Sequence, residues 1–206
     1  MSRALSYAER RKLQLRDEII EAAFDLFAER GYHDAGVTDI TERVGIGSST
    51  FYRHFDNKRD LLDAVITTVI DRWVAVLAAE NAADAAATLG DYRAQSLRIA
   101  TALNDIASDL RIIRILLGQI TGVDREFEQK VFAMFDLAVA FEAGYLDNGL
   151  QRGYLRADID TAATARAVVG MIFGTAILGL NPTIDADERT ETSHAAVQLM
   201  FDGIAK

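Results

Sequence analysis

Apolar side chains recur at helical spacing along this chain, starting near residue 19. Five of them share one side of a helix because they stand at i, i+3, i+4, i+7 and i+8: Ile19, Ala22, Ala23, Leu26 and Phe27. Gly31 follows in the position of a helix C-cap. The pattern predicts an amphipathic helix that ends before Gly31, preceded by a polar, mobile arm that reaches to about Arg16.

Two shorter apolar faces come next, with a glycine-bearing turn between them. The first face is formed by Val37, Ile40, Val44 and Ile46, and the second by Phe51 and Phe55. The turn contains Gly45 and Gly47, and glycine is the residue that most often interrupts a helical pattern. This arrangement is the outline of a helix-turn-helix.

The polar side of the second short helix indicates its use. If Phe51 and Phe55 point inward, Ser49 and Arg53 lie on the opposite side, at about 100° per residue. Hydroxyl and guanidinium groups can donate to phosphate oxygens and to base edges in a major groove. The alternative is an ordinary solvated helix face. We interpret this helix as the one that enters DNA.

Helical patterns continue to the end of the chain, and no stretch shows the sustained alternation of a strand. A fourth helix carries Leu62, Ile66, Val69, Trp73 and Leu77. Later patterns occupy residues 92–106, 110–120, 125–150, 162–180 and 188–204. The sequence therefore predicts an all-α chain of about nine helices. We expect residues 1–60 to form the N-terminal arm and helix-turn-helix domain, and residues 61–206 to form a helical effector-binding and dimerisation domain.

Charge is distributed unevenly between these two parts. The whole chain has a formal net charge of −9, whereas residues 1–60 carry 10 Lys or Arg and 11 Asp or Glu. Screening limits each charge to roughly 8 Å at physiological ionic strength, so a local basic surface can bind phosphate on an acidic protein. The basic residues of the arm are Arg3, Arg10, Arg11, Lys12 and Arg16, and those near the second short helix are Arg53, Lys58 and Arg59.

Composition argues against several other classes. The chain has no cysteine, which excludes disulfides and cysteine-based metal sites and fits a reducing cytoplasm. The N-terminus lacks a signal-peptide core, and the longest apolar run, residues 167–180, is shorter than the ~20 residues that span a bilayer. We expect that run to be a buried helix, and the protein to be cytoplasmic with no membrane partner. His33, His54 and His194 lack metal-ligand spacing, so we expect no metal, no cofactor, no catalytic residue and no enzyme activity.

The same residues carry a family resemblance. The run from Phe51 to Phe55, the following Asp56 to Lys58, and the earlier stretch from Ile19 to Tyr32 resemble the DNA-binding signature of the TetR/AcrR family of bacterial regulators. Where that family usually places Thr or Ser as helix caps, this chain has Gly36 and Gly47. We expect Thr38 and Ser48 to take over capping, since glycine contributes no hydroxyl.

The resemblance extends the set of candidate DNA-binding residues. Arg53 and Thr50 are the candidates for base edges, and Tyr52 and His54 resemble the phosphate-contacting pair of the family. A lysine in the first turn of the fourth helix is disfavoured by the helix dipole, so we expect Lys58 to contact phosphate. The whole set is Thr38, Ser48, Ser49, Thr50, Tyr52, Arg53, His54 and Lys58.

Two later helices carry faces suited to helix packing. Small residues line one side of the penultimate helix, and apolar residues recur along the last one. If both faces were buried within one chain, the protein could be a monomer, but the resemblance implies a four-helix dimer interface. The candidate interface residues are Ala167, Gly170, Met171, Gly174, Val197, Met200, Phe201 and Ile204.

Aromatic and methionine side chains are frequent between residues 73 and 173. In most helical domains such residues are simply core. The resemblance implies instead an effector pocket among the body helices, with Trp73 as the first candidate for its wall. The candidate pocket residues are Trp73, Leu77, Leu103, Leu117, Phe135, Val139 and Met171.

These expectations combine into one function. We expect a homodimeric transcriptional repressor that binds double-stranded DNA at a palindromic operator and leaves it when a small, largely apolar effector binds. The alternative is a constitutive nucleoid-associated or protein-recruiting DNA-binding protein of the same fold, without an effector.

Overall fold

The computed structural model describes residues 5–76, 81–119, 123–179, 181 and 183–204, and these form nine helices and no strand. The all-α fold expected from the sequence is therefore confirmed over the described ranges. The helices are α1 (Tyr7–Arg30), α2 (Val37–Val44), α3 (Ser48–Phe51), α4 (Lys58–Val76), α5 (Leu89–Ala107), α6 (Leu110–Gln119), α7 (Arg125–Arg152), α8 (Thr161–Leu178) and α9 (Ala186–Ile204).

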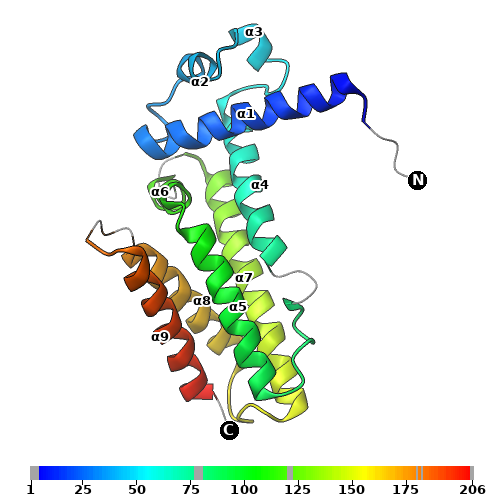
Figure 1. The fold of residues 1–206 in the computed structure, drawn as a ribbon, viewed down its shortest axis with the longest axis vertical. Coiled ribbons are helices and arrows are strands. Elements are labelled where there is room, and N and C mark those ends of the chain that lie inside the picture. Colours follow the sequence, from blue (N-terminus) through cyan, green and yellow to red (C-terminus); the bar gives the residue numbers. More distant parts are fainter. Residues whose placement is uncertain (1–4, 77–80, 120–122, 180, 182, 205–206) are drawn as a thin grey trace.

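The first three helices form a small head at one end of an elongated body. Figure 1 shows α2 and α3 above α1, while α4, α5 and α7 run from the head towards the other end, and α8 and α9 lie along one side. The helix α1 packs against α2, α4 and α6. The head is therefore held on the body by α4 and α6.

The helix α1 is longer than the sequence pattern indicated, and the expectation of a mobile arm up to Arg16 is wrong for the described part of that arm. Ser6 caps the helix and Glu9 completes a reciprocal pair: the Glu9 amide donates to Ser6 Oγ at 3.2 Å, and the Ser6 amide donates to Glu9 Oε2 at 2.7 Å. Such a capping box satisfies two amides that would otherwise lack partners. It extends α1 by more than two turns before the apolar stripe begins.

One apolar core joins the head to the adjoining end of the body. All five residues of the α1 stripe are buried, as expected, and they share a continuous cluster with Leu62 of α4, Ile112 of α6 and Phe127 of α7. The expected domain boundary at residues 60 and 61 falls inside α4, and this cluster lies across it. A second cluster around Tyr92 and Phe201 fills the far end of the body.

Ion pairs also connect the head to the body. Arg111 on α6 lies between Glu21 and Asp25 of α1, and its guanidinium stacks 4.5 Å from the ring centre of Phe24. Its Nη2 donates to Asp109 at 2.6 Å. These three carboxylates raise the pKa of Arg111, first through Asp109. The cluster ties α1 to α6 and fixes how the head sits on the body.

The helix α8 is less enclosed than its composition suggested. It is the one described helix long and apolar enough, by length and composition alone, to cross a membrane, yet only 17% of that window is buried inside the chain. Its buried residues are Ala165, Val168 and Val169. The expectation of a buried helix is therefore wrong for one side of α8, where Ala167, Gly170, Ile177 and Leu178 are exposed. The other side packs against the cores of the same chain.

Candidate nucleic-acid interface and effector cavity

A tight turn and two buried aromatic rings position α3. Gly45 ends α2 in the left-handed region, with φ of 77°, which a residue without Cβ adopts at little cost. After Gly47, α3 makes one α-helical turn, continued by hydrogen bonds from the His54 and Phe55 amides to the Phe51 carbonyl. Phe51 is fully buried and Phe55 is 1% exposed, so both anchor this segment as expected.

The opposite side of this segment faces outward. Ser48, Ser49 and Arg53 are exposed, and Tyr52 is 56% exposed. The Arg53 Nη2 donates to Thr50 Oγ1 at 2.9 Å, which pairs the two side chains expected to meet base edges. Thr38 is also exposed, whereas Thr50 and His54 are half-buried. Contact of these residues with DNA remains a prediction.

The caps of α2 and α3 differ from the expectation. Neither Gly36 nor Gly47 is replaced by a neighbouring hydroxyl as N-cap, and no side chain caps the first turn of either helix. Asp39 instead accepts a hydrogen bond from the Gly36 amide at 2.7 Å. The helix dipole stabilises a carboxylate in the first turn, such as that of Asp39. The hydroxyls of Thr38 and Ser48 do not act as caps.

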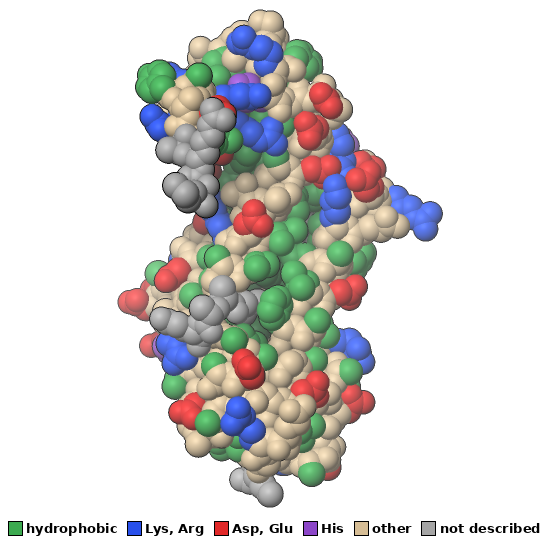
Figure 2. All heavy atoms as spheres, turned by 90° about the vertical axis from the view of Figure 1, so that its right-hand side faces the viewer, with side chains coloured by type: hydrophobic (Ala, Val, Ile, Leu, Met, Phe, Trp, Pro, Cys, Tyr) green, Lys and Arg blue, Asp and Glu red, His purple; other side chains and the backbone are tan. Residues whose placement is uncertain are grey.

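A basic surface borders α3. The N-terminal half of α1 meets the end of α3 at a surface depression lined in part by Lys12, Arg16, Arg53 and His54. Figure 2 shows Lys and Arg side chains gathered over the head, beside a histidine. Burial lowers the pKa of His54, and the charges of Lys12, Arg16 and Arg53 lower it further. A neutral imidazole among cations suits a hydrogen bond to phosphate.

Two of the basic residues have structural partners instead. Arg16 Nη1 donates to the His54 carbonyl at 2.7 Å, and its guanidinium lies 4.1 Å from the ring centre of Phe55. Arg59 faces the body, where its Nε donates to Asp124 at 2.6 Å and it also pairs with Asp63. The Arg59 guanidinium is therefore committed to the body, whereas Arg16 uses only one of its five N–H donors in its hydrogen bond to the His54 carbonyl and stays part of the basic surface.

The structure gives Lys58 partners within the chain. Its ammonium donates to the carbonyls of Tyr32, His33 and Ala35 at 2.7, 3.2 and 2.9 Å, and lies 4.4 Å from the Tyr32 ring centre. An ammonium has three protons, and all three are used. Lys58 therefore stabilises the connection between α1 and α2, and this contact, rather than phosphate, explains a cation in the first turn of α4.

We therefore expect Lys58→Met to destabilise the head without changing the salt dependence of DNA binding. Hydrogen bonds to a charged group contribute about 1.5–3 kcal/mol, and partial exposure reduces this, so we expect a loss of about 1–2 kcal/mol. Lys12→Met is the matched control, because Lys12 is exposed beside Arg53. Thermal melting and the salt slope of DNA affinity separate the two. A flattened slope with unchanged melting for Lys58→Met would show that Lys58 contacts phosphate.

An apolar cavity of about 150 Å³ lies in the body among α4 to α9. Of the seven candidates, Trp73, Leu103 and Met171 line it. Phe135 and Val139 do not: the face of α7 that meets the cavity carries Ala138, Phe141, Glu142 and Tyr145, which repeat at i, i+3, i+4 and i+7. Leu77 lies outside the described residues, as does the side chain of Leu117.

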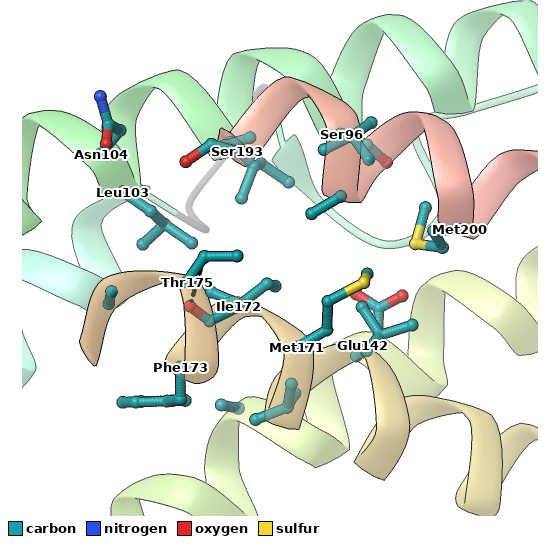
Figure 3. A pocket seen from close by; sticks show the side chains of 18 of the residues that line it. Ser96, Leu103, Asn104, Glu142, Met171, Ile172, Phe173, Thr175, Ser193 and Met200 are labelled. Atoms are coloured by element: carbon teal, nitrogen blue, oxygen red, sulfur yellow. Dashed lines mark hydrogen bonds between the residues drawn. The ribbon is translucent and has the colours of Figure 1, made fainter. Parts of the chain in front are cut away.

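Two charged residues line this cavity that the sequence analysis did not single out. Glu142 comes from α7 and Arg189 from α9. Figure 3 shows Glu142 at the same end of the cavity as Met171 and Met200, with Asn104 and Ser193 at the other end. Glu142 could have been found from the sequence, because it is a single carboxylate within an otherwise apolar face of α7.

The two candidate packing faces behave differently. In α8, Ala167 and Gly170 are exposed, and a Cβ added at Gly170 or Gly174 would meet no atom within 4 Å. The α9 candidates are not outward-facing: Met200, Phe201 and Ile204 are 8%, 2% and 6% exposed and pack in the core around Tyr92. Val197 and Met171 are half-buried and line the cavity.

Known proteins resemble this chain both in sequence and in fold. The model for "Bacterial regulatory proteins, tetR family" matches residues 19–65. The fatty acid metabolism regulator protein of Bacillus subtilis is 25% identical over 190 residues, which cover 91% of this chain and 94% of the relative.

Two solved structures show the same fold. FadR from Bacillus subtilis in complex with stearoyl-CoA superposes with a TM-score of 0.76 at 21% identity, covering 91% of this chain and 98% of that one. The complex of triclosan with SmeT of Stenotrophomonas maltophilia gives a TM-score of 0.73 at 20% identity, covering 94% and 92%. This chain therefore contains the N-terminal region of the tetR family of bacterial regulatory proteins at residues 19–65 and shares the fold of both solved structures.

Proposed function

We propose that this protein is a homodimeric, DNA-binding transcriptional repressor of the bacterial cytoplasm, released from a palindromic operator by a small apolar effector. The observation that carries the proposal is the exposed polar side of α3, presented by two fully anchored phenylalanines beside a basic surface. A two-fold protein places two such helices on the two halves of a palindrome.

The cavity supports regulation by a small molecule. Relatives with this fold have been solved with stearoyl-CoA, whose acyl chain is apolar, and with triclosan, which is largely apolar. Trp73 connects the cavity to the head, because it lies on α4 and its ring is 5.2 Å from that of Phe173 on α8. An effector that displaces this pair would tilt α4 and, through the packing of α4 against α1, change the separation of the two heads.

The effector must bind the DNA-incompatible arrangement more tightly than the other. A difference of about 3 kcal/mol corresponds to more than a hundredfold in operator affinity. This coupling is reciprocal, so operator DNA should weaken effector binding by the same factor. A constitutive DNA-binding protein would show no such coupling.

We expect Arg53→Ala to weaken operator binding by about 1–3 kcal/mol, or roughly ten- to a hundredfold, and to relax preference at one base position. In vitro selection from random duplexes would first yield the operator, and fluorescence anisotropy would then give the affinities. Arg98→Ala is the control, since Arg98 is an exposed arginine of α5, in the body. If Arg53→Ala bound the selected operator like the parent, the docking face assigned to α3 would be wrong.

A further inference from the structure

Glu142 is a half-buried carboxylate among the apolar side chains that line the cavity. Around it the lining includes Phe141, Tyr145 and Met171. Among the described lining residues the only other charged side chain is Arg189. A buried carboxylate is costly unless it is paired, so this position calls for an explanation.

The partners of Glu142 within the chain are few. The Tyr92 hydroxyl donates to Glu142 Oε1 at 3.1 Å. The other carboxylate oxygen has no hydrogen-bond donor, and the group has no ion pair, among the residues that the structure describes. Burial raises the pKa of Glu142 to about 7, opposed by the hydrogen bond from Tyr92. The group therefore changes charge near neutral pH, with one oxygen left to a ligand.

We propose that the effector is an apolar molecule about the size of one aromatic ring with a short chain, and that it carries a protonated amine that pairs with the Glu142 carboxylate. The proposal rests on the proposed function, because it assumes that this cavity is the effector site. A cavity of about 150 Å³ lined by apolar side chains can hold a single ring. The ring faces of Phe141 and Tyr145 would add cation–π attraction to the ammonium.

An anionic effector fits this cavity less well. Arg189 could receive an anion, but its Nη1 already donates to the Ile184 carbonyl at 2.9 Å. Arg189 stands one turn from Ser193 on α9, and Ser193 lies at the end of the cavity away from Glu142 (Figure 3). An anion bound there would leave its apolar tail against the carboxylate. A protonated amine instead gives the Glu142 carboxylate a partner of opposite charge.

The titration of Glu142 is separated from that of its neighbours. Tyr92 of α5 and Tyr145 of α7 both have raised pKa values, because of burial first and of Glu142 second, so they stay neutral at physiological pH. The other charged side chain of the described lining is Arg189 of α9, and the α8 residues that line the cavity are of uncharged types. An alkylamine remains protonated up to a pH of about 10. Any change in amine affinity between pH 6 and pH 8 therefore reports Glu142.

The test compares three probes that share a ring and chain: 4-phenylbutylamine, 4-phenylbutanol and 4-phenylbutanoate. Trp73 is the only tryptophan in the chain and lines the cavity, so its fluorescence measures binding directly. At pH 8 we expect the amine to bind about ten- to a hundredfold more tightly than the alcohol, as for a charge-assisted hydrogen bond. We expect the preference for the amine over the alcohol to shrink at pH 6, where Glu142 is protonated. The alcohol should bind with the same affinity at pH 6 and pH 8.

Glu142→Gln should abolish the amine preference and leave binding of the alcohol in place. Asp136→Asn is the control, because it removes one carboxylate charge from an exposed position on the same helix. If all proteins bound the alcohol but the parent did not prefer the amine, or if Glu142→Gln kept the preference, the amine proposal would be overturned while the effector cavity stood. If none of the three probes bound, both the amine proposal and the assignment of this cavity as the effector site would fail. The pH comparison on the parent protein decides the matter even if Glu142→Gln does not fold.

Discussion

Gly170→Glu is expected to make this protein monomeric and to weaken its operator binding by more than about a hundredfold. Gly170 lies on the exposed side of α8, and a Cβ there meets no atom of the same chain within 4 Å. The substitution therefore leaves the fold of one chain intact. In a dimer packed through α8, it places a charge where two helices approach closely, which is costly without a partner.

The size of the effect comes from linkage of the two heads. When one head is bound, the other binds as an intramolecular event, and such linkage raises affinity by roughly 10²- to 10⁴-fold. The last two helices also carry exposed apolar residues that a dimer packed through them would cover: Ile177 and Leu178 of α8 and Leu199 of α9 are 43%, 64% and 68% exposed. A monomer keeps a single short recognition segment.

Sedimentation velocity and operator anisotropy check this prediction together. Gln129→Glu adds the same charge to an exposed position on α7 and should leave both measurements unchanged. If the parent and Gly170→Glu sedimented alike as dimers, α8 would not form the interface. If both were monomers that bound operator equally, the homodimer itself would be excluded.

Replacing Phe51 with alanine should unfold the head. Phe51 is fully buried, with its ring centre 5.8 Å from that of Phe55. Removing a buried phenylalanine costs about 3–5 kcal/mol, which lowers the melting temperature of a chain this size by on the order of 10 °C. Operator binding should be lost at the same time, because this ring holds α3 in place.

The neighbouring residue provides the matched control. Tyr52 is also aromatic but is 56% exposed, so Tyr52→Ala should change the melting temperature little and still weaken operator binding. Thermal melting followed by circular dichroism, with operator binding below the transition, distinguishes the two variants. Equal melting temperatures for Phe51→Ala and the parent would mean that α3 is not anchored by this ring.

Local spacing predicted the helices and their inner faces well. Phe51 and Phe55 are buried as their spacing of four requires, and Gly45 provides the turn between the two short helices. The start of α1 could also have been read locally, since Ser6 and Glu9 form a recognisable capping pair. In each case the information lies within a few residues.

Contacts between distant segments could not be read in this way. The first turn of α4 offers a cation no local partner, which predicts that Lys58 contacts phosphate, but its partners in the structure are carbonyls 23 to 26 residues earlier in the chain. Met200, Phe201 and Ile204 form an apolar stripe that the sequence could place either between two chains or within one. In the structure these three residues pack against Tyr92, so the stripe is buried within one chain.

The sequence alone thus determined the all-α fold, the helix-turn-helix and the polar face of α3, because helical periodicity and turn residues act over single turns. Only the tertiary structure decided which cations remain free for phosphate, which apolar face stays uncovered on α8, and that Glu142 enters the cavity beside a tyrosine 50 residues away. Those outcomes depend on how whole helices pack, and pairing in space is not encoded in the spacing of any one helix.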